Sequence, residues 1–171
     1  SFFLVLGFST AVYSIISLHP SQKDVYVDQM INRDSPQYNI GGYIRLRGKL
    51  DVSKFVAALD YAISTLDIFR LRFDLSDEVG HARVIDSAPK LVLTEADYSG
   101  ILNAQKVAKG WMQERFNEAF EVDMQHNLYE HALLKISEEE FWFFGKYHHL
   151  ITDGVGFIVF VQFVAEQYRK L

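Results

Sequence analysis

The sequence predicts an α/β protein of the layered α+β type, in which helices cover a mixed β-sheet. Three observations point to this class. Several stretches place apolar residues at helical spacing, two pairs of strand-like stretches are joined by short polar turns, and a long apolar run near the end of the chain gains charges only at its close. The expected order is helix, strand, helix, hairpin, helix, hairpin, helix, without internal repeats or interdomain linkers.

The composition and charge of the chain limit its possible functions. Its 171 residues are 49% hydrophobic and 15% aromatic, which is enough for one domain with a buried core. Lys and Arg number 17 against 22 Asp and Glu, so the net charge of −5 argues against a nucleic-acid-binding surface. The sequence has no cysteine, which excludes disulfides, thiolate catalysis and cysteine-ligated metals. The thiol of any thioester chemistry would therefore come from a partner.

The first 18 residues carry no charge and approach the length of a membrane helix. They lack the basic start and the Ala-x-Ala-like cleavage site of a signal peptide, and they are rich in Ser, Thr, Gly and β-branched residues. We therefore expect a buried strand or helix at the domain edge, and not a membrane or signal segment. The predicted boundaries are 1–17 for an apolar segment without an assigned role and 18–171 for the domain, which we expect in the cytoplasm.

The first helix and the first strand come next. Ser21 is the expected N-cap of a helix whose apolar positions are Val25, Met30 and Ile31. Residues 38–50 alternate in part and predict a strand, weakened by the glycine pair at 41–42.

The second helix is the clearest in the sequence. Asp51 or Ser53 would cap it, and its apolar residues nearly follow the i, i+3, i+4, i+7 rule: Val52, Phe55, Val56, Leu59, Ile63 and Leu66. Residues 68–75 then alternate cleanly and predict a strand. A turn would join it to a second strand at 81–86, giving a hairpin.

Two further helices are expected in the second half of the chain. Residues 103–120 have helical apolar spacing, with Trp111 in the core, and they follow a short strand at 91–93. Residues 155–171 begin as an apolar run that could be a buried strand or a helix. The charged and amide residues from Glu166 onward favour a helix.

A second hairpin is predicted between these two helices. Its strands are residues 128–136 and 141–148, and the turn between them contains three glutamates. We expect this acidic turn to be solvated, without a metal ion. His126 and His131 lie beside or within the hairpin and are expected at the surface.

Titratable groups, a glycine and a change of hydrophobic period coincide at residues 147–154, Tyr-His-His-Leu-Ile-Thr-Asp-Gly. Adjacent side chains leave a strand on opposite faces, so His148 and His149 cannot both point into one cleft. One of them should face a site and the other the interior. Gly154 can adopt a positive φ or let another group approach the backbone, directly before a helix N-terminus with free N–H groups.

These residues are suited to acyl transfer, although none of them would serve as the nucleophile. Histidine titrates near neutral pH and can take a proton from an attacking amine or alcohol, and Asp153 could hold that histidine or the loop around it. A metal site is not favoured, because adjacent strand histidines diverge and no third histidine or carboxylate pair stands at ligand spacing. Two buried histidines and a capping aspartate are the non-catalytic alternative.

Residues 148–154, His-His-Leu-Ile-Thr-Asp-Gly, resemble the signature of the condensation domains of nonribosomal peptide synthetases, which chloramphenicol acetyltransferase shares more loosely. Two other stretches resemble motifs of that family in part. Arg70 and Phe73 match its second motif, His-Glu-x-Leu-Arg before Thr-x-Phe. The first motif is matched at Pro20, Gln22 and Tyr26.

The resemblance covers about residues 18–171 and implies the N-terminal lobe of a chloramphenicol-acetyltransferase-like fold. The family's domain has two similar lobes with the site in a tunnel between them, so this chain alone would be inactive. The implied reaction is amide formation between acyl or aminoacyl thioesters held on phosphopantetheine arms. The implied partners are carrier domains and a C-terminal lobe, and no cofactor would be bound directly.

The resemblance also implies a role for each signature residue. His149 would orient or deprotonate the amine, and His148 would pack and brace the loop. Asp153 would be structural, in an ion pair with Arg70. Gly154 would leave room for the substrates beside its backbone.

Related functions can be compared with the same residues. Heterocyclisation domains carry aspartates in place of the histidines, and epimerisation domains usually follow the signature with Ser-Trp-Arg where this chain has Val-Gly-Phe at 155–157. A free-standing acyltransferase that uses a soluble amine or alcohol is the enzymatic alternative. A non-catalytic module that docks carrier domains is the alternative from another class.

Overall fold

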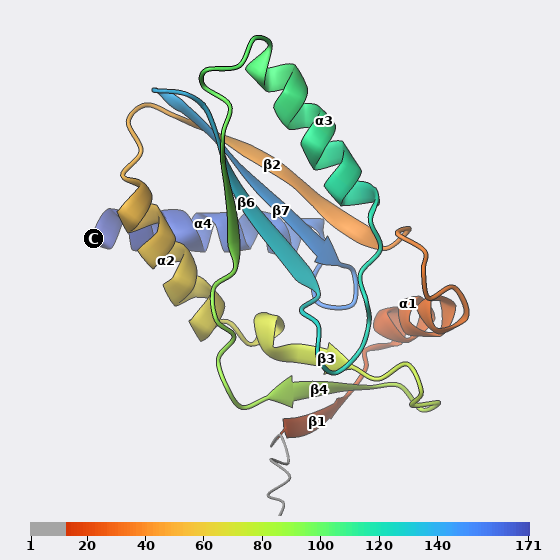
Figure 1. Cartoon of the computed structure of the whole chain (residues 1–171). Helices are drawn as coiled ribbons and strands as arrows, with labels where there is room; N and C mark the ends of the chain where they lie inside the picture. Colours follow the sequence, from red (N-terminus) through yellow and green to blue (C-terminus); the bar gives the residue numbers. More distant parts are fainter. Residues whose placement is uncertain (1–12) are drawn as a thin grey trace, which may run out of the picture.

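A computed structural model describes residues 13–171, and residues 1–12 of the predicted apolar segment lie outside the described residues. The larger of its two sheets has the order β2-β7-β6-β5 (Figure 1). Its strands are β2 (Asn39–Arg47), β7 (Glu140–His148), β6 (Tyr129–Ser137) and β5 (Leu93–Asp97). β7 pairs antiparallel with both β2 and β6, whereas β5 runs parallel to β6. The predicted mixed sheet is therefore confirmed.

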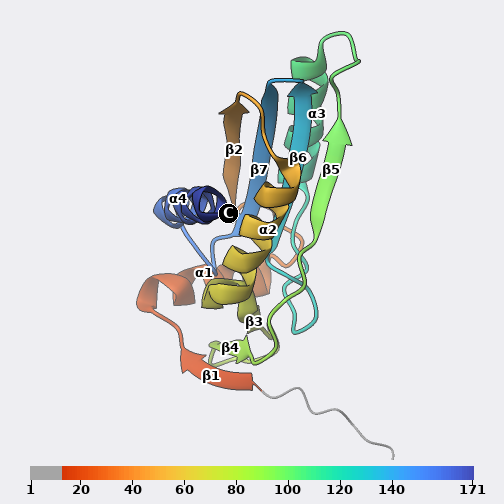
Figure 2. The same ribbon diagram turned by 90° about the vertical axis from the view of Figure 1, so that its left-hand side faces the viewer.

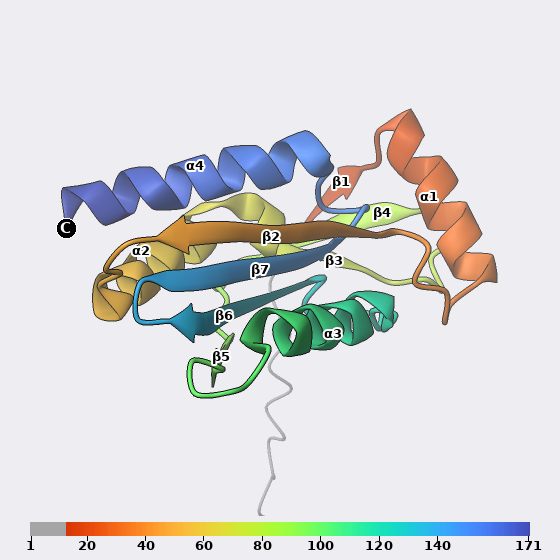
Figure 3. The same cartoon turned by 90° about the horizontal axis from the view of Figure 1, so that it is seen from above.

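Helices cover both faces of this sheet, as the edge-on views show (Figures 2 and 3). Two helices, α2 (Val52–Thr65) and α4 (Gly154–Lys170), pack on one face, and α3 (Ala104–Asn117) packs on the other. Successive residues of β7 alternate between the two cores, because Phe143 and Tyr147 face α2 and α4 while Trp142 and Phe144 face α3. None of the helices within residues 13–171 is long and apolar enough to cross a membrane.

The smaller sheet has the order β1-β4-β3 and lies near the end of β7 that carries the signature (Figure 1). Its strands are β1 (Tyr13–Ser17), β4 (His81–Ile85) and β3 (Leu71–Phe73), all paired antiparallel. The predicted hairpin of β3 and β4 is confirmed. α1 (Pro20–Ile31) follows β1 and flanks the start of β2.

The strand predicted at 68–75 is wrong in its first half. Residues Asp67–Arg70 form a 3₁₀ turn, η1, and only Leu71–Phe73 continue as a strand. Phe69 is fully buried in this turn, and its ring packs edge-on against Tyr129 and Phe160. A regular strand would alternate its side chains, whereas the turn directs Phe69 into the core while β3 still reaches β4.

Three predictions near the start of the chain also need correction. β1 is an edge strand and is not buried, since Ile15 and Ile16 are 58% and 46% exposed. His19, and not Ser21, caps α1: its ring accepts the Ser21 N–H, and the Gln22 side chain accepts the His19 N–H. Tyr26 and Gln29 are the buried residues of α1, in place of the expected apolar face.

The remaining elements follow the predictions closely. Asp51 caps α2 by accepting the Lys54 N–H. α3 lies within its predicted range, and α4 begins one residue earlier than predicted, at Gly154. The hairpin of β6 and β7 ends at His148, and the short strand predicted at 91–93 is displaced to Leu93–Asp97.

The contact between β2 and β7 gives a testable prediction at Gly41. This residue has φ of 139°, and a Cβ there would collide with the carbonyl oxygen of Gly145. We expect Gly41→Ala to lower the free energy of unfolding by about 3 kcal/mol or more, through strain and displacement of β2. Urea denaturation measures this loss.

Gly42→Ala is the matched control, because a Cβ at Gly42 meets no atom within 4 Å and the residue is in the same strand. It should change the free energy of unfolding by less than about 1 kcal/mol. Equal effects of the two substitutions would contradict the close approach of the strands.

Candidate active site

The signature lies where β7 ends and α4 begins (Figure 1). β7 stops at His148, residues 149–153 form the connecting loop, and α4 starts at Gly154. Asp153 caps the helix, since its Oδ1 accepts the Gly156 N–H at 2.7 Å and its carbonyl accepts the Phe157 N–H at 3.1 Å. The predicted change from strand to helix at this motif is confirmed.

The two histidines diverge as strand geometry requires. His148 is 1% exposed and belongs to the interior, whereas His149 is exposed to solvent. The backbone N–H of His149 donates to the Tyr38 carbonyl at 2.9 Å, so the position of this residue is fixed from the β2 side. His149 is therefore the histidine of the pair that a substrate can reach.

The hydrogen bonds of His148 define its tautomer. Its Nδ1 accepts the Leu150 N–H at 3.0 Å, so the ring proton is on Nε2, which donates to Gln29 Oε1 at 2.8 Å. Burial, assisted by the neighbouring His149, lowers the pKa of His148 to about 4. His148 is thus neutral at pH 7, and its two ring nitrogens bind Gln29 and the backbone of Leu150.

The ion pair predicted between Arg70 and Asp153 does not form. The Arg70 guanidinium donates instead to the backbone carbonyls of Ser64, at 3.2 Å, and Asp86, at 3.3 Å. Asp153 is exposed, and its carboxylate is engaged in capping α4. Neither of the two predicted arrangements for Asp153 is present, because within the described residues no hydrogen bond joins it to the ring of His149 either.

Sequence reasoning missed three residues that contact the loop. Gln29 bonds His148, Gln22 Nε2 donates to the Leu150 carbonyl at 3.0 Å, and Tyr38 accepts the His149 N–H. Of these, the sequence singles out only Gln22, as a match to the family's first motif. Two glutamines seven residues apart on one helix were the available signal, because that spacing is nearly two turns and puts both on one face.

The prediction that His131 lies at the surface is wrong. His131 is 1% exposed, surrounded by aromatic rings, and its Nε2 lies 2.6 Å from the Tyr147 hydroxyl. Burial lowers its pKa to about 3, so it is neutral. It sits on β6 facing α4, where the strand's alternation points it inward.

His126 is exposed, as predicted, and lies in a small acidic cluster. Ligand atoms of Glu121, Asp123 and His126 lie within 4.8 Å of one another. His126 Nδ1 is 2.8 Å from Asp123 Oδ2, and this carboxylate raises the pKa of His126. The ion pair accounts for the cluster.

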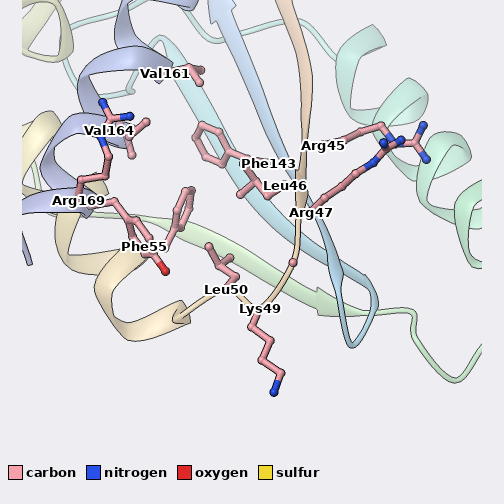
Figure 4. A pocket seen from close by; sticks show the side chains of 13 residues that line it. Arg45, Leu46, Arg47, Lys49, Leu50, Phe55, Phe143, Val161, Val164 and Arg169 are labelled. Carbon is pink, nitrogen blue, oxygen red and sulfur yellow. The ribbon is translucent and has the colours of Figure 1, made fainter.

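A pocket of about 380 Å³ opens between the second half of α4, the start of α2 and the end of β2 (Figure 4). Apolar side chains line this pocket, among them Phe55, Phe143 and Val164. Four cationic side chains also line it: Arg45, Arg47, Lys49 and Arg169. Val161 at its near side follows Gly154 by seven residues, or about 10 Å of helix. The pocket is therefore distinct from the signature loop.

The class defined by the fold and the site is a layered α+β domain with two adjacent histidines at a strand-to-helix junction. The family model described as "Condensation domain" matches residues 12–171, and the chain belongs to this family. A dimodular nonribosomal peptide synthase of Bacillus subtilis is 29% identical over 156 residues, which are 91% of this chain and 6% of that protein.

Two solved structures agree with this assignment. The starter condensation domain of rhizomide synthetase RzmA has 29% sequence identity and a TM-score of 0.81, and the match covers 91% of this chain and 37% of that one. A mutant of the same domain in complex with C8-CoA and Leu-SNAC matches with 28% identity and a TM-score of 0.81, over 90% and 35% of the two chains. This chain thus spans little more than a third of the solved domains.

The two buried neutral histidines predict a pH dependence of stability. His148 and His131 have pKa values of about 4 and about 3, whereas unfolded histidine titrates near 6.5. As the pH falls below about 6.5, the unfolded chain binds protons that the folded chain does not, so stability falls. Each histidine contributes up to about 1.4 kcal/mol per pH unit down to its folded pKa. Urea denaturation between about pH 7 and about pH 5 measures the slope.

His131→Leu is the test variant, because it removes one of the two groups. Its slope should be about half that of the parent. The exposed His126, whose pKa is raised, acts in the opposite direction, so His126→Ala should make the slope steeper. Stability that is independent of pH in this window would contradict the burial of neutral imidazoles.

The contacts of Asp153 predict its thermodynamic behaviour. Asp153→Ala should lower the free energy of unfolding by about 1 kcal/mol, the usual cost of losing an N-cap. Because Arg70 makes its hydrogen bonds elsewhere, the effects of Asp153→Ala and Arg70→Ala should add within about 0.5 kcal/mol in the double variant. Asp51→Ala, at the cap of α2, is the matched control. A coupling energy above about 1 kcal/mol between the two substitutions would contradict this and indicate an ion pair between Arg70 and Asp153.

Proposed function

We propose that this chain is the N-terminal lobe of a condensation domain that forms amide bonds in nonribosomal peptide synthesis. The observation that carries the proposal is the exposed His149 beside the buried His148, in the family's signature, at the junction of β7 and α4. The family assignment over residues 12–171 supports the same reaction.

In the proposed reaction, the amine of an acceptor aminoacyl thioester attacks the carbonyl carbon of a donor acyl thioester. His149 accepts or orients the amine proton as the new C–N bond forms. The tetrahedral intermediate then collapses, the C–S bond breaks, and the proton passes to the departing thiolate. Electrostatic stabilisation of the intermediate would lower the same barrier. His148 is neutral and buried, and it would take no part in proton transfer.

The proposed substrates are thioesters on the phosphopantetheine arms of carrier domains. These carrier domains are the proposed partners, and the proposed location is the cytoplasm. The likeness to a domain solved with C8-CoA and Leu-SNAC supports an acyl donor and an aminoacyl acceptor. No cofactor bound directly by this chain is needed for the reaction.

A second lobe is part of the proposal. The chain spans about 37% of the solved starter domain, and the outward face of α4 beside the signature is apolar. Val155, Ile158 and Val159 on this face are 69%, 55% and 57% exposed. An exposed apolar stripe next to a catalytic histidine is a surface that another lobe would cover.

The test of the proposed function is His149→Ala in the full-length protein. The rate of amide formation from C8-CoA and Leu-SNAC should fall by roughly two to four orders of magnitude, the effect of losing a positioned acid–base group. His126→Ala is the matched control, because this histidine is exposed and its ring contacts Glu121 and Asp123, and it should leave the rate unchanged.

Two outcomes would contradict the proposal. An unchanged rate in His149→Ala would remove the catalytic role of this residue. Amide formation by the isolated 171 residues, at the rate of the full-length protein, would refute the need for a second lobe.

A further inference from the structure

The backbone of the signature loop is held at every residue from 148 to 151. The N–H of His148 donates to the Leu128 carbonyl, that of His149 to the Tyr38 carbonyl, and that of Ile151 to the His148 carbonyl. The N–H of Leu150 donates to the His148 ring, as described above. Little freedom remains for His149 other than rotation of its side chain, so its reach depends on where this loop is held.

Two side chains of α1 complete this arrangement. Gln29 accepts from His148 Nε2 at 2.8 Å, and Gln22 donates to the Leu150 carbonyl at 3.0 Å. These contacts lie on the two residues that flank His149 in the chain. A single helix, far from the signature in sequence, therefore forms hydrogen bonds to the loop on both sides of the exposed histidine.

The amide of Gln29 is itself fixed. It is 1% exposed, and its NH₂ group donates to the carbonyls of Asn32 at 2.8 Å and Arg33 at 3.0 Å, where α1 ends. With both protons used in this way, only Oε1 can face His148, and it can only accept. The acceptor therefore selects the Nε2–H tautomer, which leaves Nδ1 free to bind the Leu150 N–H.

Gln22 is oriented in the same manner. Its Oε1 accepts the His19 N–H at 2.9 Å in the capping box of α1, which turns its NH₂ group toward the Leu150 carbonyl. Both glutamines thus link the ends of α1 to the loop through amides whose orientation is set by helix-terminal backbone groups.

We infer that Gln29, assisted by Gln22, is a positioning residue for His149: it fixes the tautomer of His148 and thereby the loop that presents the catalytic imidazole. This inference rests on the proposed function of His149. Replacing Gln29 by an apolar residue would leave the Nε2–H of His148 without its acceptor, and the loop could relax by rotating that ring. A displacement of His149 by about 1 Å is enough to lower a rate by about 10²-fold.

The test uses Gln29→Met in the full-length protein, with C8-CoA and Leu-SNAC as substrates. We expect kcat to fall by on the order of 10²-fold while KM stays within about twofold, because the residue acts on the catalytic group and not on the substrates. In a His149→Ala background, Gln29→Met should cause no further loss, since the group it positions is gone.

Tyr26→Phe is the matched control on the same helix. Tyr26 is equally buried, and its hydroxyl contacts the carbonyls of Asp74 and Asp77 in the turn between β3 and β4, away from the signature. It should lower the melting temperature as Gln29→Met does but leave kcat unchanged. If both variants lower kcat to the same extent, the effect is structural and the inference is overturned.

Gln22→Met is a second variant, at a half-buried position, that removes the other hydrogen bond from α1 to the loop. It tests the positioning role of α1 if Gln29→Met does not fold. It should lower kcat by about tenfold, again only when His149 is present. Normal kcat in both glutamine variants, with His149→Ala inactive, would reject the inference while the proposed function stands. Normal kcat in His149→Ala itself would reject the proposed function and the inference with it.

Discussion

The candidate site depends on one buried, neutral imidazole. His148 cannot carry a charge in its environment, and a neutral imidazole has one donor and one acceptor. Both are used, the first toward α1 and the second toward the backbone of its own loop. This arrangement links a helix from the start of the chain to the turn before α4. It also gives the two histidines different tasks, because the strand that buries His148 must expose its neighbour.

The walls around this imidazole come from segments far apart in the sequence. The rings of Tyr38 and Phe120 each lie 6.2 Å from His148. Phe120 follows the end of α3, whose last carbonyls accept hydrogen bonds from Lys146 and Asn39. A buried lysine on β7 is tolerated here because helix-terminal carbonyls satisfy a cation well. The contacts that surround His148 therefore come from α1, from the large sheet and from the segment after α3.

The sequence predicted the elements that have a strong period or a clear cap. The hairpin ending at His148, the helix near Gly154 and the cap of α2 at Asp51 or Ser53 depend on local alternation, turn composition and capping chemistry, which act within a few residues. The predictions failed where burial decided the outcome. Phe69 forms part of a 3₁₀ turn because it packs against β6 and α4, and His131 is buried because it packs against Phe143 and Phe160.

For the site, the sequence by itself determined that two adjacent histidines diverge at a strand end and that a helix follows within a few residues of Gly154. The divergence follows from the backbone geometry of a strand, and the helix follows from the local pattern of apolar and charged residues. The residues alone left open which histidine is buried, and the family resemblance implied that it is His148. Only the tertiary structure decided that Gln29 accepts its proton and that Arg70 and Asp153 stay apart. The physical reason is that a hydrogen bond or an ion pair forms only between groups that the whole fold brings within about 3 to 4 Å, and sequence spacing does not encode that distance.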